Sequence, residues 1–499
     1  MIATTYTCAH EGVDSYVVRA EARVTKGIPR VVIVGLPDTA VREGQERVRA
    51  AIRATLADFP TSNQIVVNLS PASRRKAGAA FDLAIAMAIL VSAGRCKARA
   101  LDGTLFLGEL GLDGGLRAVP GALPATVAAV ANHFARVVVP SSNATEAAIV
   151  EGARVHAVGS LAEVLELAES GYAAEPASVD VDRLLGAAGD GSPIDLAEVR
   201  GQAAARRALE IAAAGHHHVL MVGPPGSGKT MLARRLPTVL SPPSLAEAIE
   251  TTSIHSIAGL NRTGGLIVRR PFRAPHHTTS GAGMVGGGRV PGPGEISLAH
   301  NGVLFLDELP EFAPSVLNQL REPLEDRQLT ISRARGSLQF PAAFMLVGAM
   351  NPCPCGFYAT GVKSCTCAES AIARYRTRLS GPLLDRIDLH VHVPRLEFSE
   401  LATRAAGESS AQVRGRVDAA WRVRRQACAA AGGAAALVGT ARSLMARAAG
   451  AMSLSARSVA RSTAVAQTIA YLAGRAEIEA ADVAEALQYR PGADLGGHD

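Results

Sequence analysis

The sequence predicts an α/β protein with a helical C-terminal part, and three observations support this fold class. A short apolar run at 219–222 leads into a glycine-rich loop and then into a helical pattern. A second apolar run, at 302–306, ends in two adjacent carboxylates. From about residue 398 onward the chain is alanine-rich and has few β-branched runs, as helices do. Together these patterns predict a parallel-sheet core followed by helices.

Length and composition limit the class of protein. The chain has 499 residues, 48% of them apolar, which is enough for two to four domains with buried cores. No stretch is long and apolar enough to cross a membrane, and the first residues lack a secretory pattern. The formal net charge of +6 is mild, and seven cysteines are too few for a disulfide framework. We therefore expect a cytoplasmic protein without a membrane partner.

Changes of pattern along the chain predict four parts. Apolar runs at 31–34, 64–69, 105–107 and 136–139 are typical of strands, and the stretches 43–56, 81–92 and 161–168 are typical of helices. A stretch rich in Ala, Gly, Ser, Pro and Asp follows, which predicts a linker. The expected boundaries are 1–171 for an N-terminal domain, 172–195 for the linker, 196–396 for the core domain and 397–499 for a helical domain.

The loop after the run at 219–222 is a phosphate-binding motif. It reads GPPGSGKT and sits between a predicted strand and a predicted helix, which is the context that this motif requires. Only five lysines occur in the chain, so the lysine in this motif strengthens the assignment. We expect Lys229 to reach the β- and γ-phosphates of ATP and the Thr230 hydroxyl to bind Mg²⁺. The predicted nucleotide-binding residues are Gly223, Pro224, Pro225, Gly226, Ser227, Gly228, Lys229 and Thr230.

The two carboxylates at the end of the second apolar run complete this chemistry. Asp307 suits a role at Mg²⁺, and Glu308 suits the base that polarises the attacking water. A strand ending in Asp-Glu is common by itself, but it gains meaning from the phosphate loop before it. The adjacent glutamate favours hydrolysis over simple nucleotide binding.

Three further polar residues are candidates for the same reaction. A third apolar run at 344–349 ends near Asn351, which in P-loop ATPases with an inserted strand holds the lytic water. Arg386 is a candidate for an arginine supplied to a neighbouring subunit, with a surface ion pair as the alternative. Arg457 opens a C-terminal helix and is a candidate contact to the γ-phosphate of its own subunit.

Four cysteines cluster in two C-x-C pairs, Cys353 with Cys355 and Cys365 with Cys367. Four thiolates this close in sequence can bind Zn²⁺ in tetrahedral geometry, although C-x-x-C is the commoner spacing. Free thiols are an equally strong alternative, and a redox pair is a third one.

Taken in order, the motifs resemble those of an AAA+ ATPase of the magnesium-chelatase-like clade, and more closely the ComM/YifB family. The match covers residues 1–400 strongly and the C-terminal helices moderately. The residues that carry it are GLP at 35–37, VNLSP at 67–71, FDLA at 81–84, GELG at 108–111, RPFRAPHH at 270–277, NPCPCG at 351–356 and LSGPLLDR at 379–386.

The resemblance implies an AAA+ core with an N-terminal α+β domain similar to the Lon protease domain and a C-terminal helical lid. In Lon the pattern Lys-x-Gly-x-Ser supplies a serine nucleophile, which a distant lysine activates. Here Lys76 opens the pattern, but Ala80 stands where the serine would be. Without a hydroxyl there is no nucleophile, so we expect a non-proteolytic scaffold.

The resemblance also implies a hexameric ring that hydrolyses ATP and moves DNA, in branch migration during natural transformation. The alternatives are a magnesium-chelatase-like motor subunit and a protein-remodelling ATPase. Two basic segments bear on DNA binding. Residues 251–294 hold five arginines and no carboxylate, which predicts a flexible cationic loop, and 329–338 predicts a hairpin. Solvated surface loops are the alternative, and the candidate DNA contacts are Arg269, Arg270, Arg273, Arg333 and Arg335.

Overall fold

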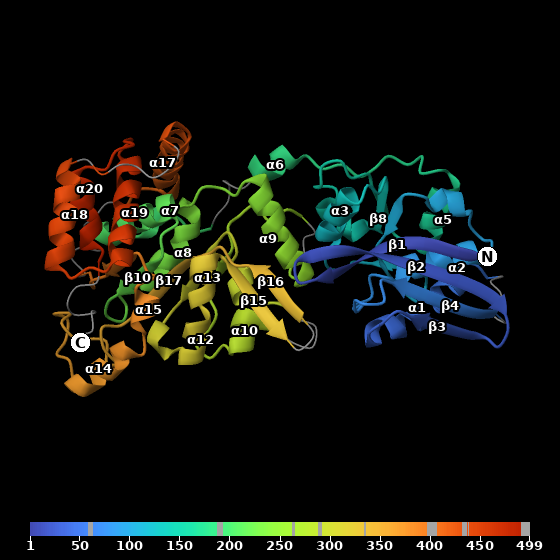
Figure 1. Cartoon of the computed structure of the whole chain (residues 1–499), viewed down its shortest axis with the longest axis horizontal. Coiled ribbons are helices and arrows are strands. Elements are labelled where there is room, and N and C mark those ends of the chain that lie inside the picture. Colours follow the sequence, from blue (N-terminus) through green and yellow to red (C-terminus); the bar gives the residue numbers. More distant parts are fainter. Residues whose placement is uncertain are drawn as a thin grey trace. The chain divides into compact units, whose positions relative to one another are not determined.

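The computed structural model describes residues 1–57, 63–186, 193–261, 265–287, 292–333, 336–396, 407–431, 437 and 439–490. These residues fold into two compact units (Figure 1). The first unit comprises Met1–Ala187, Ser244–Val268 and Gly288–Gly292. The second comprises Ala188–Pro243, Arg269–Gly287 and Pro293–Asp499.

The first unit is built on a seven-stranded mixed sheet with the order β3-β4-β2-β1-β5-β8-β9. A long antiparallel hairpin forms its centre, from β1 (Ile2–Glu11) and β2 (Asp14–Lys26). The strand β4 pairs antiparallel with β2, whereas the remaining neighbours in the sheet pair in parallel. The other strands of the sheet are β3 (Arg30–Val34), β4 (Asn63–Ser70), β5 (Thr104–Phe106), β8 (Arg136–Pro140) and β9 (Val155–Val158).

Alternate residues of these strands feed two hydrophobic cores, one on each face of the sheet. Phe106 and Val138 belong to the core under α1 (Thr39–Thr55), α2 (Asp82–Ser92) and α5 (Leu161–Glu169). Their neighbours Leu105 and Val137 belong to the core under α3 (Ala122–Ala131) and α4 (Ala144–Ala147). The sheet therefore lies between two helical layers.

The strands and helices predicted in this region are present, but the β1–β2 hairpin was not predicted. The burial of β1 alternates from Ile2 to Tyr6, which is the signature of a half-buried strand. Threonines at alternating positions hid this pattern, because Thr5 and Thr7 are buried despite their hydroxyls.

The segment Ser244–Val268 lies in the first unit, although it follows the phosphate loop in the chain and we predicted it as part of the core domain. Its helix α9 (Leu245–Ile257) begins with a capping box between Ser244 and Glu247. Apolar residues of this segment share a small core with α3. The buried carboxylate of Glu146 accepts hydrogen bonds from Ser256 Oγ at 3.0 Å and from Asn261 Nδ2 at 3.1 Å.

The second unit is built on a five-stranded parallel sheet with the order β11-β14-β17-β10-β18. The strand β17 (Met345–Met350) lies between β10 (Val219–Val222) and β14 (Val303–Leu306), as an inserted strand does. The edge strands are β11 (Phe272–Arg273) and β18 (Leu389–His392). Because all the strands are parallel, the ends of β10, β14 and β17 meet at one edge of the sheet.

Helices cover both faces of this sheet. Val219 and Met221 face the core that contains α7 (Ala203–Gly215) and α8 (Lys229–Val239). Leu220 and Val222 face the opposite core, which is formed by shorter helices. These are α11 (Glu295–Leu298), α12 (Pro314–Gln319), α13 (Arg321–Asp326), α14 (Glu369–Thr377) and α15 (Gly381–Leu384).

The C-terminal part is helical, as predicted, and shares the core of α7 and α8 (Figure 1). Its helices are α17 (Ser410–Ala431), α18 (Gly439–Ala451), α19 (Ala456–Leu472) and α20 (Ala480–Gln488). The buried carboxylate of Asp388, just before β18, binds Arg461 of α19 at 2.6 Å. This ion pair ties the helices to the edge of the sheet.

The remaining elements are short. A hairpin is formed by β15 (Gln328–Arg333) and β16 (Gly336–Pro341), so the predicted hairpin is confirmed. The others are β6 (Glu109–Leu110), β7 (Leu116–Arg117), α6 (Val181–Gly186), α10 (Gly281–Val285), β12 (Gly286–Gly287) and β13 (Gly292–Pro293). Among the described residues, no helix has the length and apolar character needed to cross a membrane.

Candidate active site

The phosphate loop joins β10 to α8, and its glycines are required by geometry. A Cβ on Gly223 would lie 2.1 Å from the carbonyl oxygen of Val393. Gly226 and Gly228 have φ angles of +74° and +93°, which side-chain-bearing residues rarely adopt. The hydroxyl of Ser227 is buried and finds no partner among the described residues. The loop therefore fits a phosphate group at the N-terminus of α8.

Lys229 stands at the first position of α8 and is only 9% exposed. Its Nζ donates to the carbonyl oxygens of Gly223 at 2.7 Å and Pro224 at 3.0 Å, and to Asn351 Oδ1 at 3.2 Å. Burial lowers the pKa of Lys229, and the charge of Asp307 opposes this shift. The ammonium group is thus held inside the loop where phosphates would bind.

Thr230 and Asp307 form the candidate magnesium site. Thr230 Oγ1 donates a hydrogen bond to Asp307 Oδ2 at 2.7 Å. A hydroxyl and a carboxylate are ligands that Mg²⁺ accepts when phosphate oxygens and water complete its shell. These two groups fit the predicted ion.

Glu308 follows Asp307 directly and presents its carboxylate outward. Its backbone has a φ of +51°, an uncommon conformation for a residue with a side chain. The backbone N–H of Glu308 donates to Asp307 Oδ1 at 3.0 Å, and the side chain is 58% exposed. His277 Nδ1 lies 3.4 Å from Glu308 Oε2. The sequence had singled out His277 within a family motif but had not connected it with Glu308.

Asn351 follows the inserted strand β17 and lies between the phosphate loop and Asp307. The predicted convergence of Lys229, Thr230, Asp307 and Asn351 is present in the structure. One contributor had not been predicted. The Nε2 of Gln202 donates to Ser227 O at 3.3 Å and to Pro394 O at 2.6 Å. This side chain therefore links the phosphate loop to the segment that follows β18. The only local signal was a Gly-Gln pair just before the helix α7.

The two candidate arginines lie together rather than beside Lys229. Arg386 Nη2 and Arg457 Nη2 bind the same oxygen, Oε1 of Glu325, at 2.8 and 3.2 Å. Arg386 is buried, whereas Glu325 is 37% exposed. The hydrogen bond from Arg386 lowers the pKa of Glu325. Glu325 had not been predicted, because it lies far from both arginines in the sequence.

The basic segment 251–294 is not one flexible loop, which corrects that prediction. Phe272 and Arg273 form the edge strand β11, and Phe272 stacks on Phe305 with ring centroids 5.9 Å apart. Arg273 makes two 2.7 Å hydrogen bonds to Glu295, and Arg270 donates to backbone oxygens at 2.7 and 2.8 Å.

The other three predicted DNA contacts are Arg269, Arg333 and Arg335. Arg269 has a partner within the chain. Arg333 ends β15 near the tip of the hairpin, and Arg335 lies outside the described residues.

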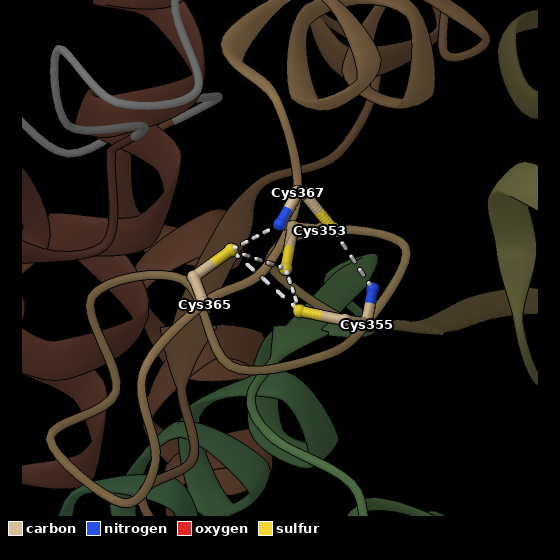
Figure 2. Close-up of side chains that lie close together, drawn as sticks. All are labelled: Cys353, Cys355, Cys365 and Cys367. Carbon is tan, nitrogen blue, oxygen red and sulfur yellow. Dashed lines mark hydrogen bonds between the residues drawn. The ribbon is translucent and has the colours of Figure 1, made fainter.

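The four clustered cysteines converge from two stretches of one loop (Figure 2). Their sulfur atoms all lie within 4.8 Å of one another. Three of the Sγ–Sγ distances are 3.4, 3.6 and 3.7 Å. A tetrahedral zinc site with Zn–S bonds of about 2.3 Å requires sulfur atoms about 3.8 Å apart. The cluster could therefore hold a metal ion.

Backbone N–H groups point at these sulfur atoms, as they do around metal-bound thiolates. Tyr358 N donates to Cys353 Sγ at 3.3 Å, and Cys355 N donates to Cys367 Sγ at 3.4 Å. Backbone hydrogen bonds from Thr366 and Phe357 lower the pKa of the Cys355 thiol to about 6.

The segment 76–80, which resembles the Lys-x-Gly-x-Ser pattern but lacks the serine, lies in the first unit. Lys76 is fully buried, and its Nζ donates to the carbonyl oxygens of Pro71 and, at 2.8 Å, Arg74. Burial lowers the pKa of Lys76. Ala80 packs at the edge of an apolar core and offers no hydroxyl.

The strand order and the converging groups define a P-loop nucleotide-binding domain. The models of magnesium chelatase subunit ChlI match residues 195–401, 20–143 and, for its C-terminal part, 407–490. YifB of Escherichia coli is 42% identical over 422 residues, covering 84% of this chain and 81% of YifB. The competence protein ComM of Haemophilus influenzae is 41% identical over 503 residues, covering 98% and 97%. The chain therefore belongs to the ComM/YifB family of magnesium-chelatase-like AAA+ proteins.

A further similarity concerns a protease. Lon protease 2 of Bacillus subtilis is 29% identical over 187 residues, which cover 32% of this chain and 33% of that protein.

Proposed function

We propose that this chain hydrolyses ATP as an AAA+ motor. The observation that carries the proposal is the convergence of Lys229, Thr230, Asp307 and Asn351 at one edge of a parallel sheet, with Glu308 beside them. Thr230 and Asp307 would hold Mg²⁺, which neutralises phosphate charge when it is bound. Lys229 stabilises the terminal phosphates, and Asn351 orients the water from which Glu308 accepts a proton.

The first test separates nucleotide binding from turnover. Glu308→Gln removes the base but keeps the shape, so we expect ATP binding within about two-fold of the parent and turnover lowered by about 100-fold or more. Glu311→Gln is the matched control, because this nearby exposed carboxylate forms a 2.7 Å ion pair with the exposed residue Arg378. Retained turnover in Glu308→Gln would overturn the assignment of the base.

We propose further that Arg386 and Arg457 act on the nucleotide of a neighbouring subunit in a hexameric ring. Both bind one oxygen of Glu325, which supports a shared target rather than separate ones. This revises the expectation that Arg457 acts within its own subunit. An arginine from outside stabilises the charge that develops on the γ-phosphate.

Mixing two inactive variants tests this arrangement. In mixed rings, an Arg386→Ala subunit keeps Glu308, and a Glu308→Gln neighbour supplies Arg386. We expect each variant alone to be inactive and the mixture to recover a measurable fraction of turnover. An inactive mixture that still forms rings, as seen by light scattering, would contradict the role of Arg386 in a neighbour's site.

We propose that the substrate of the motor is DNA, and that it drives branch migration in recombination during natural transformation. The ComM relative, a competence protein by name, supports this proposal, as does the hairpin β15–β16 with Arg333 near its tip. Steady-state ATP hydrolysis should be measured without DNA, with duplex and with a four-way junction, at two salt concentrations. We expect salt-sensitive stimulation that is largest for the junction.

A second candidate is a magnesium-chelatase-like motor subunit, which the descriptions of the matching family models favour. A protein-remodelling ATPase is the third. If no DNA stimulates hydrolysis, the DNA proposal fails, and a protein or chelatase partner becomes the target of the search. The Lon-like part is proposed to be a non-proteolytic scaffold, because Ala80 stands in place of a nucleophile.

We propose that the four clustered cysteines hold one structural Zn²⁺. The sulfur–sulfur distances and the N–H groups that point at the sulfur atoms support this assignment. Metal analysis of the purified protein should find about one zinc per chain. Less than about a tenth of an equivalent, also after incubation with Zn²⁺ under reducing conditions, would exclude the metal.

A further inference from the structure

The turn that carries the first two cysteines is continuous with the nucleotide site. Cys353 is fully buried and lies two residues after Asn351, whose amide oxygen accepts a hydrogen bond from Lys229 at 3.2 Å. Any displacement of Cys353 therefore acts on the backbone that positions Asn351.

The same turn also lies against the phosphate loop. Gly356 has a φ of +87°, and a Cβ at this position would lie 2.5 Å from Cδ and 2.8 Å from Cγ of Pro225. The backbone of Gly356 thus forms a wall for the loop residue Pro225. Cys353 and Cys355 both lie in the short segment of chain that joins Asn351 to Gly356.

Regular secondary structure does not hold this loop in place. Residues 351–368, all of which are described, contain neither helix nor strand. The turn is closed by Gly356 N donating to Cys353 O at 3.0 Å and by Tyr358 N donating to Cys353 Sγ at 3.3 Å. Four sulfur atoms meeting within 4.8 Å form its centre. Because thiolates repel one another, a cation at this centre would fix the shape of the whole loop.

We propose that metal occupancy of the four-cysteine cluster controls nucleotide affinity. The metal fixes the turn at 353–356. This turn contacts Pro225 of the phosphate loop through Gly356, and it positions Asn351 through the backbone that precedes Cys353. This inference rests on the proposed Zn²⁺ site. It goes beyond that site by assigning the soft divalent metal a regulatory effect on ATP binding rather than a purely structural one.

The experiment measures zinc content and the affinity for a fluorescent ADP analogue on the same samples. Binding is measured without Mg²⁺, so that a zinc chelator cannot act through the metal of the nucleotide. Removing zinc from the full chain, or introducing Cys365→Ser, should weaken nucleotide binding about ten-fold, and added Zn²⁺ should restore it for the unmodified chain only. Cys428→Ser is the control, because Cys428 is exposed in α17 and outside the cluster.

A second variant tests the wall without touching a ligand. Gly356→Ala places a methyl group against Pro225, so zinc should stay at about one equivalent while nucleotide affinity falls about ten-fold. Gly361→Ala is the matched control: it has a similar φ of +67°, but a Cβ there would contact nothing within 4 Å. Both variants place an alanine at a positive φ, and the 2.5 Å approach to Pro225 is the main difference between them.

The outcomes separate this inference from the zinc assignment. Absence of zinc overturns the proposed metal site and the inference with it. Bound zinc whose removal leaves nucleotide affinity unchanged overturns the inference alone, as does equal affinity of Gly356→Ala and Gly361→Ala.

Discussion

Two buried lysines, Lys229 in the second unit and Lys76 in the first, make the same kind of contact and support different conclusions. The ammonium group of Lys229 donates to two carbonyl oxygens of its own loop, at 2.7 and 3.0 Å. The ammonium group of Lys76 donates to the carbonyl oxygens of Pro71 and Arg74. Burial lowers the pKa of both side chains.

The neighbours make the difference. Lys229 also donates to Asn351 and stands beside Thr230, whose hydroxyl binds Asp307. Lys76 opens a motif in which Ala80 replaces a nucleophile. The backbone of Lys76 instead ties the chain together, since it bonds to Leu36 O and Asp38 N at 3.2 and 2.9 Å. A buried lysine therefore indicates a functional site only where other polar side chains that can bind a ligand lie beside it.

The largest expected effect separates the two lysines by nucleotide binding. Lys229→Ala removes a charge-assisted hydrogen bond worth up to about 3 kcal/mol, so the affinity for ATP should fall about 100-fold. Lys76→Ala should leave the affinity within about two-fold, because Lys76 belongs to the other compact unit. Titration with a fluorescent ATP analogue measures both values. A comparable loss in both variants would show that the comparison is mistaken.

A smaller effect should separate them by stability. Lys76→Met leaves the carbonyl oxygens of Pro71 and Arg74 without their donor, which should lower the local stability of the first unit by about 2 kcal/mol. Hydrogen exchange of peptides from β3 and β4 would report this loss, while peptides from β10 should not change. Lys97→Met is the control, because Lys97 is exposed. Unchanged exchange in the β3 and β4 peptides of Lys76→Met would refute the structural role.

The smallest effect is expected at Ala80. Restoring the hydroxyl with Ala80→Ser should produce no peptidase activity, because the ammonium of Lys76 is already bound to carbonyl oxygens. Cleavage of an unstructured protein such as casein, followed by gel electrophoresis with and without ATP, measures this. Cleavage that appears with Ala80→Ser and not with Ala80→Thr would show that the scaffold keeps a latent catalytic site.

The sequence was sufficient for the parts of the site that follow from local pattern. The strand, the glycine loop and the helix at Lys229 are adjacent in the chain, and Asp307, Glu308 and Asn351 each end an apolar strand. Parallel pairing then brings these ends together. The four cysteines were visible too, but their spacing did not show that the four sulfur atoms lie within 4.8 Å of one another.

Contacts between distant segments could not be predicted in the same way. Glu325 meets Arg386 and Arg457 only through the packing of separate helices, and His277 reaches Glu308 only through the pairing of β11 with β14. For the arginines of the basic segment 251–294, the sequence predicted exposure where the structure shows ion pairing of Arg273. Their charge suggested an exposed loop, whereas Arg273 is paired with Glu295, the first acidic residue after that segment.

The segment Ser244–Val268 belongs to the first unit but interrupts the sequence of the second, so the two units cannot be separated by a single cut in the chain. The first unit is discontinuous in sequence, because α9 follows the phosphate loop in the chain and still belongs to this unit. Cutting the gene in the predicted linker at 172–195 would therefore not release an intact ATPase. It would remove the apolar residues against which α9 packs, such as Leu123 and Ile149, and would leave Ala248 and Leu266 exposed to water. We therefore expect the two units to fold together as parts of one chain.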